Sequence, residues 1–272
     1  MAYGYPKMIC RLAIEYSDGS MEDIISDQSW KAKPGPITFS SIYGGEDYDA
    51  NLETTGWDLP SYDDQWWKSS LIVDGPPALN SQLEPPLRIL DSFTVKKITQ
   101  PKPGIWVYDL GQNASGIFRI SVKGRKGSQI SMRPAELVRD DGLITQDAVG
   151  APVYFDYTLK GGSTETWQPR FTYYGFRYIQ VEGGIPADEP NPDHLPVITE
   201  IKGLHTRNSA DETGSFSCSN DLFNRTFKLI NWAIKSNMAS VLTDCPHREK
   251  LGWLEEAHLV GPSIRYNYNI SG

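Results

Sequence analysis

The feature that most constrains the fold is a change of period after residue 206. Residues 93–205 consist of short runs rich in β-branched and aromatic side chains, most of them separated by glycine. Runs of this length and composition predict the strands of an antiparallel β-sandwich. Residues 219–242 instead place apolar side chains at three- and four-residue steps, which predicts an amphipathic helix with Ser219 or Asn220 as its N-cap. We therefore expect a mainly β chain with helices at its C-terminal end.

Residues 1–92 also give strand signals, in a less regular pattern. An Asp-Gly step at 18–19 predicts a tight turn between two short strands. Pro-Pro pairs at 76–77 and 85–86 predict extended, irregular backbone before the regular strands begin. At the other end, one amphipathic helix and a second short helix cannot bury a core by themselves. They must either dock on the β domains or open a larger helical domain.

Composition excludes several classes of protein. The 272 residues carry a net charge of −8, and the pI of about 5.1 argues against nucleic-acid partners, which need a basic surface. We expect no membrane span, because no run approaches the roughly 18 apolar residues that one requires. Three cysteines, an odd number, predict no disulfide framework.

The stretch TDCPHREKLGWLEEAHLVG, residues 243–261, concentrates side chains that could act on a sugar. Glycoside hydrolysis needs a carboxylic acid that protonates the leaving oxygen and a second carboxylate across the sugar ring. Further acids and an arginine can hold hydroxyl groups, and an indole ring can pack against the sugar. The candidates are Asp244, Arg248, Glu249, Trp253, Glu255 and Glu256. This stretch would supply one half of such a site.

The same residues also have structural interpretations. Asp244 is well placed to cap a new helical turn that starts near Pro246, and Arg248 to form an ion pair with a neighbouring acid. Glu255 and Glu256 fit the solvated first turn of a helix. His247 and His258 lie eleven residues apart, without the spacing of a metal site, so we expect no bound metal and a hydrogen-bonded structural role for such histidines.

Residues 244–253, DCPHREKLGW, resemble the signature of bacterial α-L-rhamnosidases of glycoside hydrolase family 78, in a form one residue shorter than the commoner one. Further segments resemble other motifs of that family, in the same order. They are YGGEDYDANLETTGW (43–57), YDDQWW (62–67), the stretch beginning VYDLGQNASG (107–142) and WQPRFTYYGFRYIQVEG (167–183).

The resemblance implies a string of β-sandwich domains, jelly-roll or concanavalin-like, ahead of an (α/α)6 barrel. Residues 1–92 would be the C-terminal part of a galactose-binding-like sandwich. Residues 93–206 would be a complete sandwich, and residues 207–272 the truncated start of the barrel. The chain is then expected to be a fragment that begins and ends inside domains. Its compartment stays open between exported and cytoplasmic, because the true N-terminus would lie upstream.

The resemblance also implies an activity, the removal of terminal α-L-rhamnose from glycosides or polysaccharides by an inverting mechanism without a cofactor. By motif position, Glu249 would be the general acid, Asp244 and Arg248 would bind rhamnose hydroxyls, and Trp253 would line the pocket near the sugar's methyl group. Glu256 matches the last acid of the signature, although Glu255 could exchange roles with it. The general base would lie further along the barrel, so we expect this chain to be inactive by itself.

Two rival functions remain at this level. One is a non-catalytic carbohydrate-binding or scaffolding sandwich, and the other is a different (α/α)6 enzyme. For the sandwich motifs we expect structural roles. Residues 109–116 would serve turn geometry, and residues 170–177 would pack the sandwich against the barrel.

Overall fold

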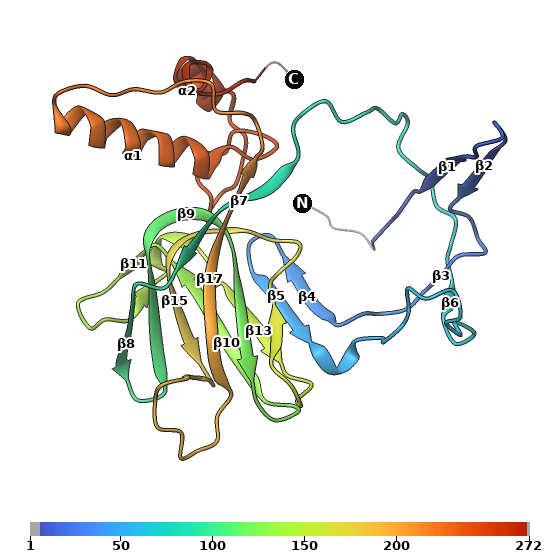
Figure 1. Ribbon diagram of the computed structural model, residues 1–272, viewed down its shortest axis with the longest axis horizontal. Coiled ribbons are helices and arrows are strands. Elements are labelled where there is room, and N and C mark those ends of the chain that lie inside the picture. Colours follow the sequence, from blue (N-terminus) through green and yellow to red (C-terminus); the bar gives the residue numbers. More distant parts are fainter. Residues whose placement is uncertain (1–5, 271–272) are drawn as a thin grey trace. The chain divides into compact units, whose positions relative to one another are not determined.

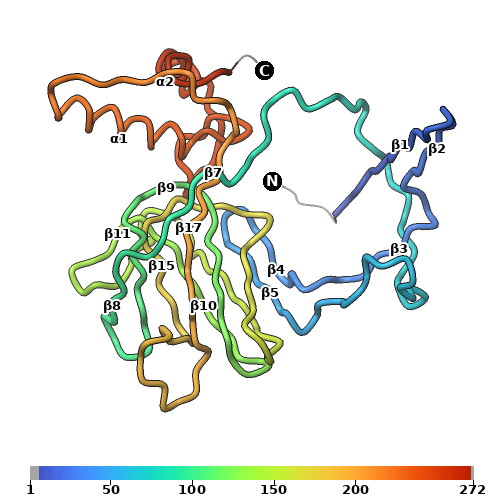
Figure 2. Tube along the Cα trace, in the orientation of Figure 1, coloured from blue at the N-terminus to red at the C-terminus, as the bar shows by residue number. Residues whose placement is uncertain are grey.

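The computed structural model describes residues 6–270 (Figure 1). The chain is mainly β with two helices at its C-terminal end, as predicted. It divides into two compact units, one of Met1–Gly35 with Thr54–Ser81 and one of Pro36–Glu53 with Gln82–Gly272. The Cα trace of Figure 2 lets the reader follow the chain as it leaves the first unit after Gly35 and enters it again at Thr54.

The smaller unit consists of short antiparallel strand pairs. β1 (Arg11–Glu15) and β2 (Met21–Ile25) form the predicted hairpin. Its turn uses Gly19 at a φ of +82°, and the Asp18 side chain accepts a hydrogen bond of 2.9 Å from the Ser20 N–H. β3 (Lys31–Ala32) pairs with β6 (Lys68–Ser69).

The larger unit is built on one long strand, β9 (Ile105–Lys123). The first half of β9 pairs with β8 (Lys97–Lys102) and β15 (Tyr174–Glu182), and its second half with β14 (Glu165–Trp167) and β17 (Val197–Asn208). The short runs of residues 93–205 predicted short strands, whereas β9 is a single strand of 19 residues. At the change of partners a Cβ on Gly116 would lie 2.0 Å from the carbonyl oxygen of Leu204, so only glycine fits.

The remaining strands extend the two layers. One layer continues from β15 through β10 (Gln129–Ala135), β13 (Tyr154–Thr158), β5 (Gly45–Asp49) and β4 (Ile37–Ser41). The other gains β7 (Leu87–Thr94) and β16 (Ile185–Pro186) beside β17. β11 (Leu137–Val138) and β12 (Ile144–Thr145) form a small hairpin, and single 3₁₀ turns span Ala50–Leu52 and Asp147–Val149.

Residues 36–53 belong to the larger unit, together with the sandwich, rather than with the residues that precede them. β5 pairs in parallel with β13, which buries most of its residues. The expected boundary at residue 92 thus does not coincide with the division into compact units. A parallel pairing between segments more than a hundred residues apart leaves no local signal in either of them.

Aromatic side chains fill the space between the layers. Phe118 of β9 meets Phe155 of β13 edge to face, at 5.0 Å between ring centroids, and Phe176 of β15 at 6.2 Å. Trp167 packs against Tyr157 at 5.4 Å. Edge-to-face contacts of this kind add to the free energy of burial. Nine of the buried residues of this core are aromatic, so part of the chain's aromatic content serves to fill it.

The helices lie together at one end of the sandwich, beside the arch of β9 (Figure 1). α1 (Asp221–Asn237) has Asn220 as its N-cap, with the Asn220 side chain accepting from the Leu222 N–H at 2.9 Å. It docks through Trp232, whose ring lies 5.6 Å from Phe93 and 5.4 Å from His205. α2 (Leu254–Asn267) contributes Ile264 to a small shared core. None of the helices within residues 6–270 is long and apolar enough to cross a membrane.

The predicted helix 219–242 ends earlier than expected, at Asn237. The chain reverses there, because the Asn237 carbonyl oxygen accepts from the N–H groups of Ala239 (3.2 Å) and Thr243 (3.0 Å). Met238 and Leu242 then pair in an isolated β-bridge. The apolar periodicity of the sequence continues past this reversal, so the pattern predicted too long a helix.

Replacing the central ring of the core should destabilise the larger unit. Phe118→Ala removes a side chain that is 1% exposed and leaves a cavity among three aromatic neighbours. We expect a loss of about 3–5 kcal/mol in the free energy of unfolding, measured by urea denaturation. Phe171→Ala, at a ring that is 69% exposed, is the matched control and should change it by less than about 0.5 kcal/mol. Equal losses would contradict this assignment of the core.

Candidate functional site

The candidate site is the segment between the two helices, residues 243–253, which we call the 243–253 loop. Its ends are joined by Asp244, whose N–H donates to the Leu251 carbonyl oxygen at 3.1 Å while its Oδ1 accepts from the Leu251 N–H at 3.2 Å. The expected helical turn at Pro246 is absent from this loop. The four residues from Pro246 form an isolated turn that Lys250 ends with a φ of +53°, and α2 begins only at Leu254. Asp244 therefore closes a loop rather than capping a helix.

The charge on Asp244 is stabilised within this loop. Burial by itself would raise the pKa of Asp244, but hydrogen bonds from Cys245 and from the Leu251 N–H outweigh it and hold the pKa below its usual range. Asp244 is therefore an acceptor for hydrogen bonds at neutral pH. That is the property a carboxylate needs in order to hold sugar hydroxyls.

Glu249 lies between two other predicted site residues. Arg248 donates to Glu249 Oε1 at 2.7 Å, and the indole Nε1 of Trp253 donates to Glu249 Oε2 at 3.2 Å. The Glu249 side chain remains 33% exposed, so a ligand can reach the carboxylate. The structure thus brings Arg248, Glu249 and Trp253 together, and it confirms the ion pair that was the structural alternative for Arg248.

Glu255 and Glu256 occupy the first turn of α2, where the helix dipole favours acidic side chains. Within residues 6–270, no side-chain hydrogen bond or ion pair joins either of them to Glu249. Trp253 precedes them as the N-cap residue, and its carbonyl oxygen accepts from the Glu256 N–H at 3.1 Å. In the described part of the chain, neither acid is therefore joined to Arg248, Glu249 or Trp253 by a side-chain hydrogen bond or ion pair.

His247 ties the loop to the sandwich. Its Nε2 lies 2.9 Å from Oε2 of Glu136, and Asn113 donates to Oε1 of the same carboxylate at 2.9 Å. Burial would raise the pKa of Glu136, but these two partners outweigh it and lower that pKa. A structural role for His247 was expected, whereas no sequence signal pointed to Glu136. No group of three acidic, histidine or cysteine side chains among the described residues could hold a metal ion.

Residues 173–175 also contact the loop, as expected for part of the segment 170–177. The Gly175 N–H donates to the Pro246 carbonyl oxygen at 3.0 Å, and a Cβ on Gly175 would lie 2.6 Å from the Pro246 ring. Arg177 does not reach the loop but forms two hydrogen bonds of 2.8 Å with Asp109. Asp109 also accepts from the Gly111 N–H, which fits the expected turn role of that motif.

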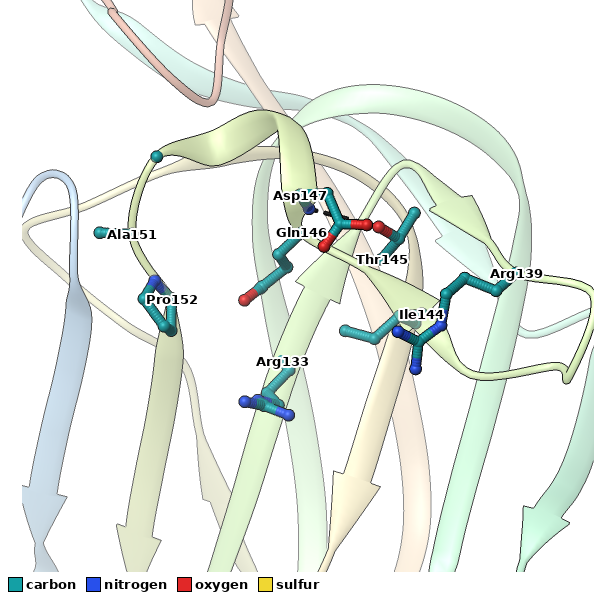
Figure 3. A pocket seen from close by; sticks show the side chains of 9 residues that line it. Arg133, Arg139, Ile144, Thr145, Gln146, Asp147, Ala151 and Pro152 are labelled. Atoms are coloured by element: carbon teal, nitrogen blue, oxygen red, sulfur yellow. Dashed lines mark hydrogen bonds between the residues drawn. The ribbon is translucent and has the colours of Figure 1, made fainter.

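A separate pocket of ≈ 410 Å³ lies on the sandwich around β12 (Figure 3). Arg133 and Arg139 line it, together with Gln146 and Asp147. Gln146 is already committed to the backbone, since it donates to the carbonyl oxygens of Pro134 and Val153 and accepts from the Val153 N–H. With one carboxylate in its lining, this pocket lacks the acid pair of a glycosidase.

Adding a methyl group at Gly175 should push the loop away from the sandwich. In Gly175→Ala the new Cβ would overlap the Pro246 ring, which must move or strain β15. We expect a loss of about 1–3 kcal/mol in the free energy of unfolding. Gly75→Ala, where a Cβ would meet nothing within 4 Å, is the control, and a loss of the same size there would refute the proposed contact.

Acid should weaken the tie through Glu136. Because its folded pKa is lowered, the unfolded chain binds more protons near the ordinary value of 4.5, so the stabilisation is present above that pH and is lost as the pH falls through the folded pKa. Glu136→Gln should therefore flatten the fall in unfolding free energy between about pH 5 and 3, followed by urea denaturation. Glu189→Gln, on an exposed turn, should leave the fall unchanged. Parallel curves for wild type and Glu136→Gln would show that the tie contributes nothing.

Comparison with known proteins gives one consistent result. Residues 1–91, 99–202 and 211–272 match three family models, described as the alpha-L-rhamnosidase N-terminal domain, the bacterial alpha-L-rhamnosidase concanavalin-like domain and the bacterial alpha-L-rhamnosidase 6 hairpin glycosidase domain. An alpha-L-rhamnosidase of Streptomyces avermitilis is 37% identical over 265 residues, which are 96% of this chain and 25% of the relative. One from Formosa agariphila is 34% identical over 279 residues, 99% of this chain and 28% of the relative. The chain thus spans about a quarter of the length of each relative.

Solved structures agree with the sequences. An alpha-L-rhamnosidase from Dictyoglumus thermophilum superposes with a TM-score of 0.92 at 37% identity, over 98% of this chain and 30% of that one. The Streptomyces avermitilis enzyme, solved in complex with L-rhamnose, gives a TM-score of 0.88 at 37% identity, over 96% of this chain and 25% of that one. An Aspergillus terreus enzyme gives 0.87 at 35% identity, over 96% of this chain and 30% of that one.

Proposed function

The chain belongs to the bacterial α-L-rhamnosidase family, and from this premise we propose that it is part of an enzyme that removes terminal α-L-rhamnose from glycosides or polysaccharides. The observation that carries the proposal is the arrangement of the 243–253 loop. It presents an accessible carboxylate, Glu249, between a guanidinium group and an indole ring. Acid, cation and aromatic face are the groups that protonate, hold and stack a sugar.

In the proposed mechanism Glu249 is the general acid. A general acid must carry a proton when the glycosidic oxygen leaves, whereas the ion pair with Arg248 forms with a charged carboxylate. Arg248 should therefore turn from Glu249 to the hydroxyl groups of the bound sugar. Asp244 would accept hydrogen bonds from the same hydroxyls, and Glu256 or Glu255 would supply a further acceptor. Trp253 would face the methyl group of rhamnose.

Inversion requires a second carboxylate roughly 6.5–9.5 Å from the first, with space for a water molecule between them. We propose that this general base lies in the remainder of the helical domain. The apolar surface of α1 supports that view, because Leu222, Phe223 and Leu229 are 59%, 57% and 73% exposed. Further helices of an (α/α)6 barrel would cover such a face. This chain by itself should then have no hydrolytic activity.

Hydrolysis of an aryl α-L-rhamnoside tests the proposal with three samples. They are this chain, a longer protein that continues it through a complete helical domain, and that longer protein with Glu249→Gln. We expect activity in the longer wild-type protein alone, with kcat reduced by about 10²–10⁴-fold in the variant because glutamine cannot donate the proton.

The other outcomes point elsewhere. Full activity of Glu249→Gln would move the acid to Glu255, Glu256 or another residue. Cleavage of a different aryl glycoside would indicate another enzyme of the same barrel type. Sugar binding without hydrolysis in all three samples would favour a carbohydrate-binding module.

A further inference from the structure

Lys250 is the point at which three distant segments of the chain meet. It follows Glu249 directly, yet its side chain is turned into the protein, and the residue is 8% exposed. Its Nζ donates to the carbonyl oxygen of Tyr173 at 2.6 Å and to that of Ile42. Ile42 lies in the turn between β4 and β5, and Tyr173 precedes β15. One ammonium group therefore joins the 243–253 loop to two separate parts of the sandwich.

Tyrosine rings surround this ammonium group. Nζ lies 4.7 Å from the ring centroid of Tyr173, 5.2 Å from that of Tyr174 and 5.9 Å from that of Tyr43. Within residues 6–270 no carboxylate forms an ion pair with Lys250. Its charge is stabilised instead by carbonyl oxygens and by the faces of aromatic rings. Burial lowers the pKa of Lys250 to about 8, which leaves the amine largely protonated at neutral pH.

The partners of Lys250 are themselves held in place. The buried carboxylate of Glu46 accepts hydrogen bonds from the N–H groups of Arg170 (3.1 Å) and Phe171 (3.3 Å). Thr172 donates to the Ile42 carbonyl oxygen at 3.4 Å. These bonds tie the β4–β5 turn to the segment before β15. Lys250 thus binds to a preformed cradle rather than to two independent loops.

Tyr43 connects the cradle to Glu249. Its hydroxyl donates to the Glu249 carbonyl oxygen at 3.0 Å, while its ring faces the Lys250 ammonium. Both residues are therefore anchored to the sandwich, Glu249 through its carbonyl oxygen and Lys250 through its ammonium group. The Glu249 side chain instead bonds to Arg248 and Trp253 and is 33% exposed, within reach of a ligand.

We propose that Lys250 is a positioning residue, whose ammonium group fastens the loop that carries Glu249 to the sandwich at the carbonyl oxygens of Ile42 and Tyr173, inside the cage of Tyr43, Tyr173 and Tyr174. The sandwich then contributes to catalysis, because it fixes the position of Glu249, the general acid. The link to catalysis rests on the proposed function, whereas the fastening of the loop does not.

The first test needs no substrate. Lys250→Met keeps an unbranched stem among the rings and removes the donors, and a buried charge can often be replaced by an apolar side chain without loss of the fold. In this chain, amide hydrogen exchange of peptides spanning 243–253 should become about tenfold faster or more, because the Asp244–Leu251 hydrogen bonds lose their support. Peptides of α1 should not change.

The matched control is Lys235→Met. Lys235 is partly buried, with a side chain 14% exposed, lies 5.3 Å from the ring centroid of Trp232 and pairs with Glu212. It belongs to α1 rather than to the loop, so its loss should leave exchange in 243–253 unchanged. Unchanged exchange in Lys250→Met, or equal acceleration in Lys235→Met, overturns the proposal. If Lys250→Met does not fold, Tyr43→Phe replaces it, because it keeps the ring and removes only the hydrogen bond to Glu249.

The second test uses the longer protein and separates positioning from general loss of structure. In the longer protein, Lys250→Met should displace Glu249 and so lower kcat by about a hundredfold for a rhamnoside with a poor leaving group such as phenol. The loss should be several-fold smaller for 2,4-dinitrophenol, which departs with little help from an acid. Equal losses on both substrates would contradict a role through Glu249. If the longer wild-type protein cleaves neither substrate, the proposed function fails, and the exchange experiment still decides whether Lys250 fastens the loop.

Discussion

The structure depends on the passage of one strand, β9, through both layers of the sandwich. Because β9 pairs with β15 before Gly116 and with β17 after it, the two layers cannot be separated without breaking a continuous ladder of hydrogen bonds. The bend brings the carbonyl of Leu204 so close to Gly116 that no side chain fits there. Phe118, two residues later, turns into the core and meets rings from the opposite layer. Backbone continuity and aromatic packing thus support each other at the same place.

The sandwich supports the 243–253 loop from several sides. Within the 243–253 loop, Asp244 and Leu251 join the ends, and Glu249 bonds to Cys245, Arg248 and Trp253. Thr243 bonds to Asn237 at the end of α1, and further attachments come from the sandwich and differ in chemistry. They are an imidazole–carboxylate contact at His247, a close backbone approach at Pro246 and an ammonium in an aromatic cage at Lys250. Catalytic groups benefit from such support, because a carboxylate acts well only when its own position is fixed.

Several elements were accessible from the amino-acid order because their causes are local. Short glycine-bounded runs predicted the strands, and apolar side chains at helical spacing predicted α1 with Asn220 as its cap. The hairpin at Gly19 followed from the requirement of its turn for a positive φ. The predicted end of α1 at residue 242 was wrong, because the chain reverses at Asn237 although the apolar periodicity continues. Motif resemblance added the family and the grouping of Arg248, Glu249 and Trp253.

The sequence by itself therefore determined the succession of strands and helices and the chemical character of the 243–253 loop. Only the tertiary structure decided what holds that loop. The parallel pairing of β5 with β13 brings Tyr43 to the loop, and the ladder of β10 with β15 carries Glu136 there, although both residues lie more than a hundred positions earlier. Tertiary packing places Lys250 among three tyrosine rings, and its position in the sequence between a glutamate and a leucine does not predict that role. Contacts of this kind arise from the folding of distant segments onto one another, and no local pattern encodes them.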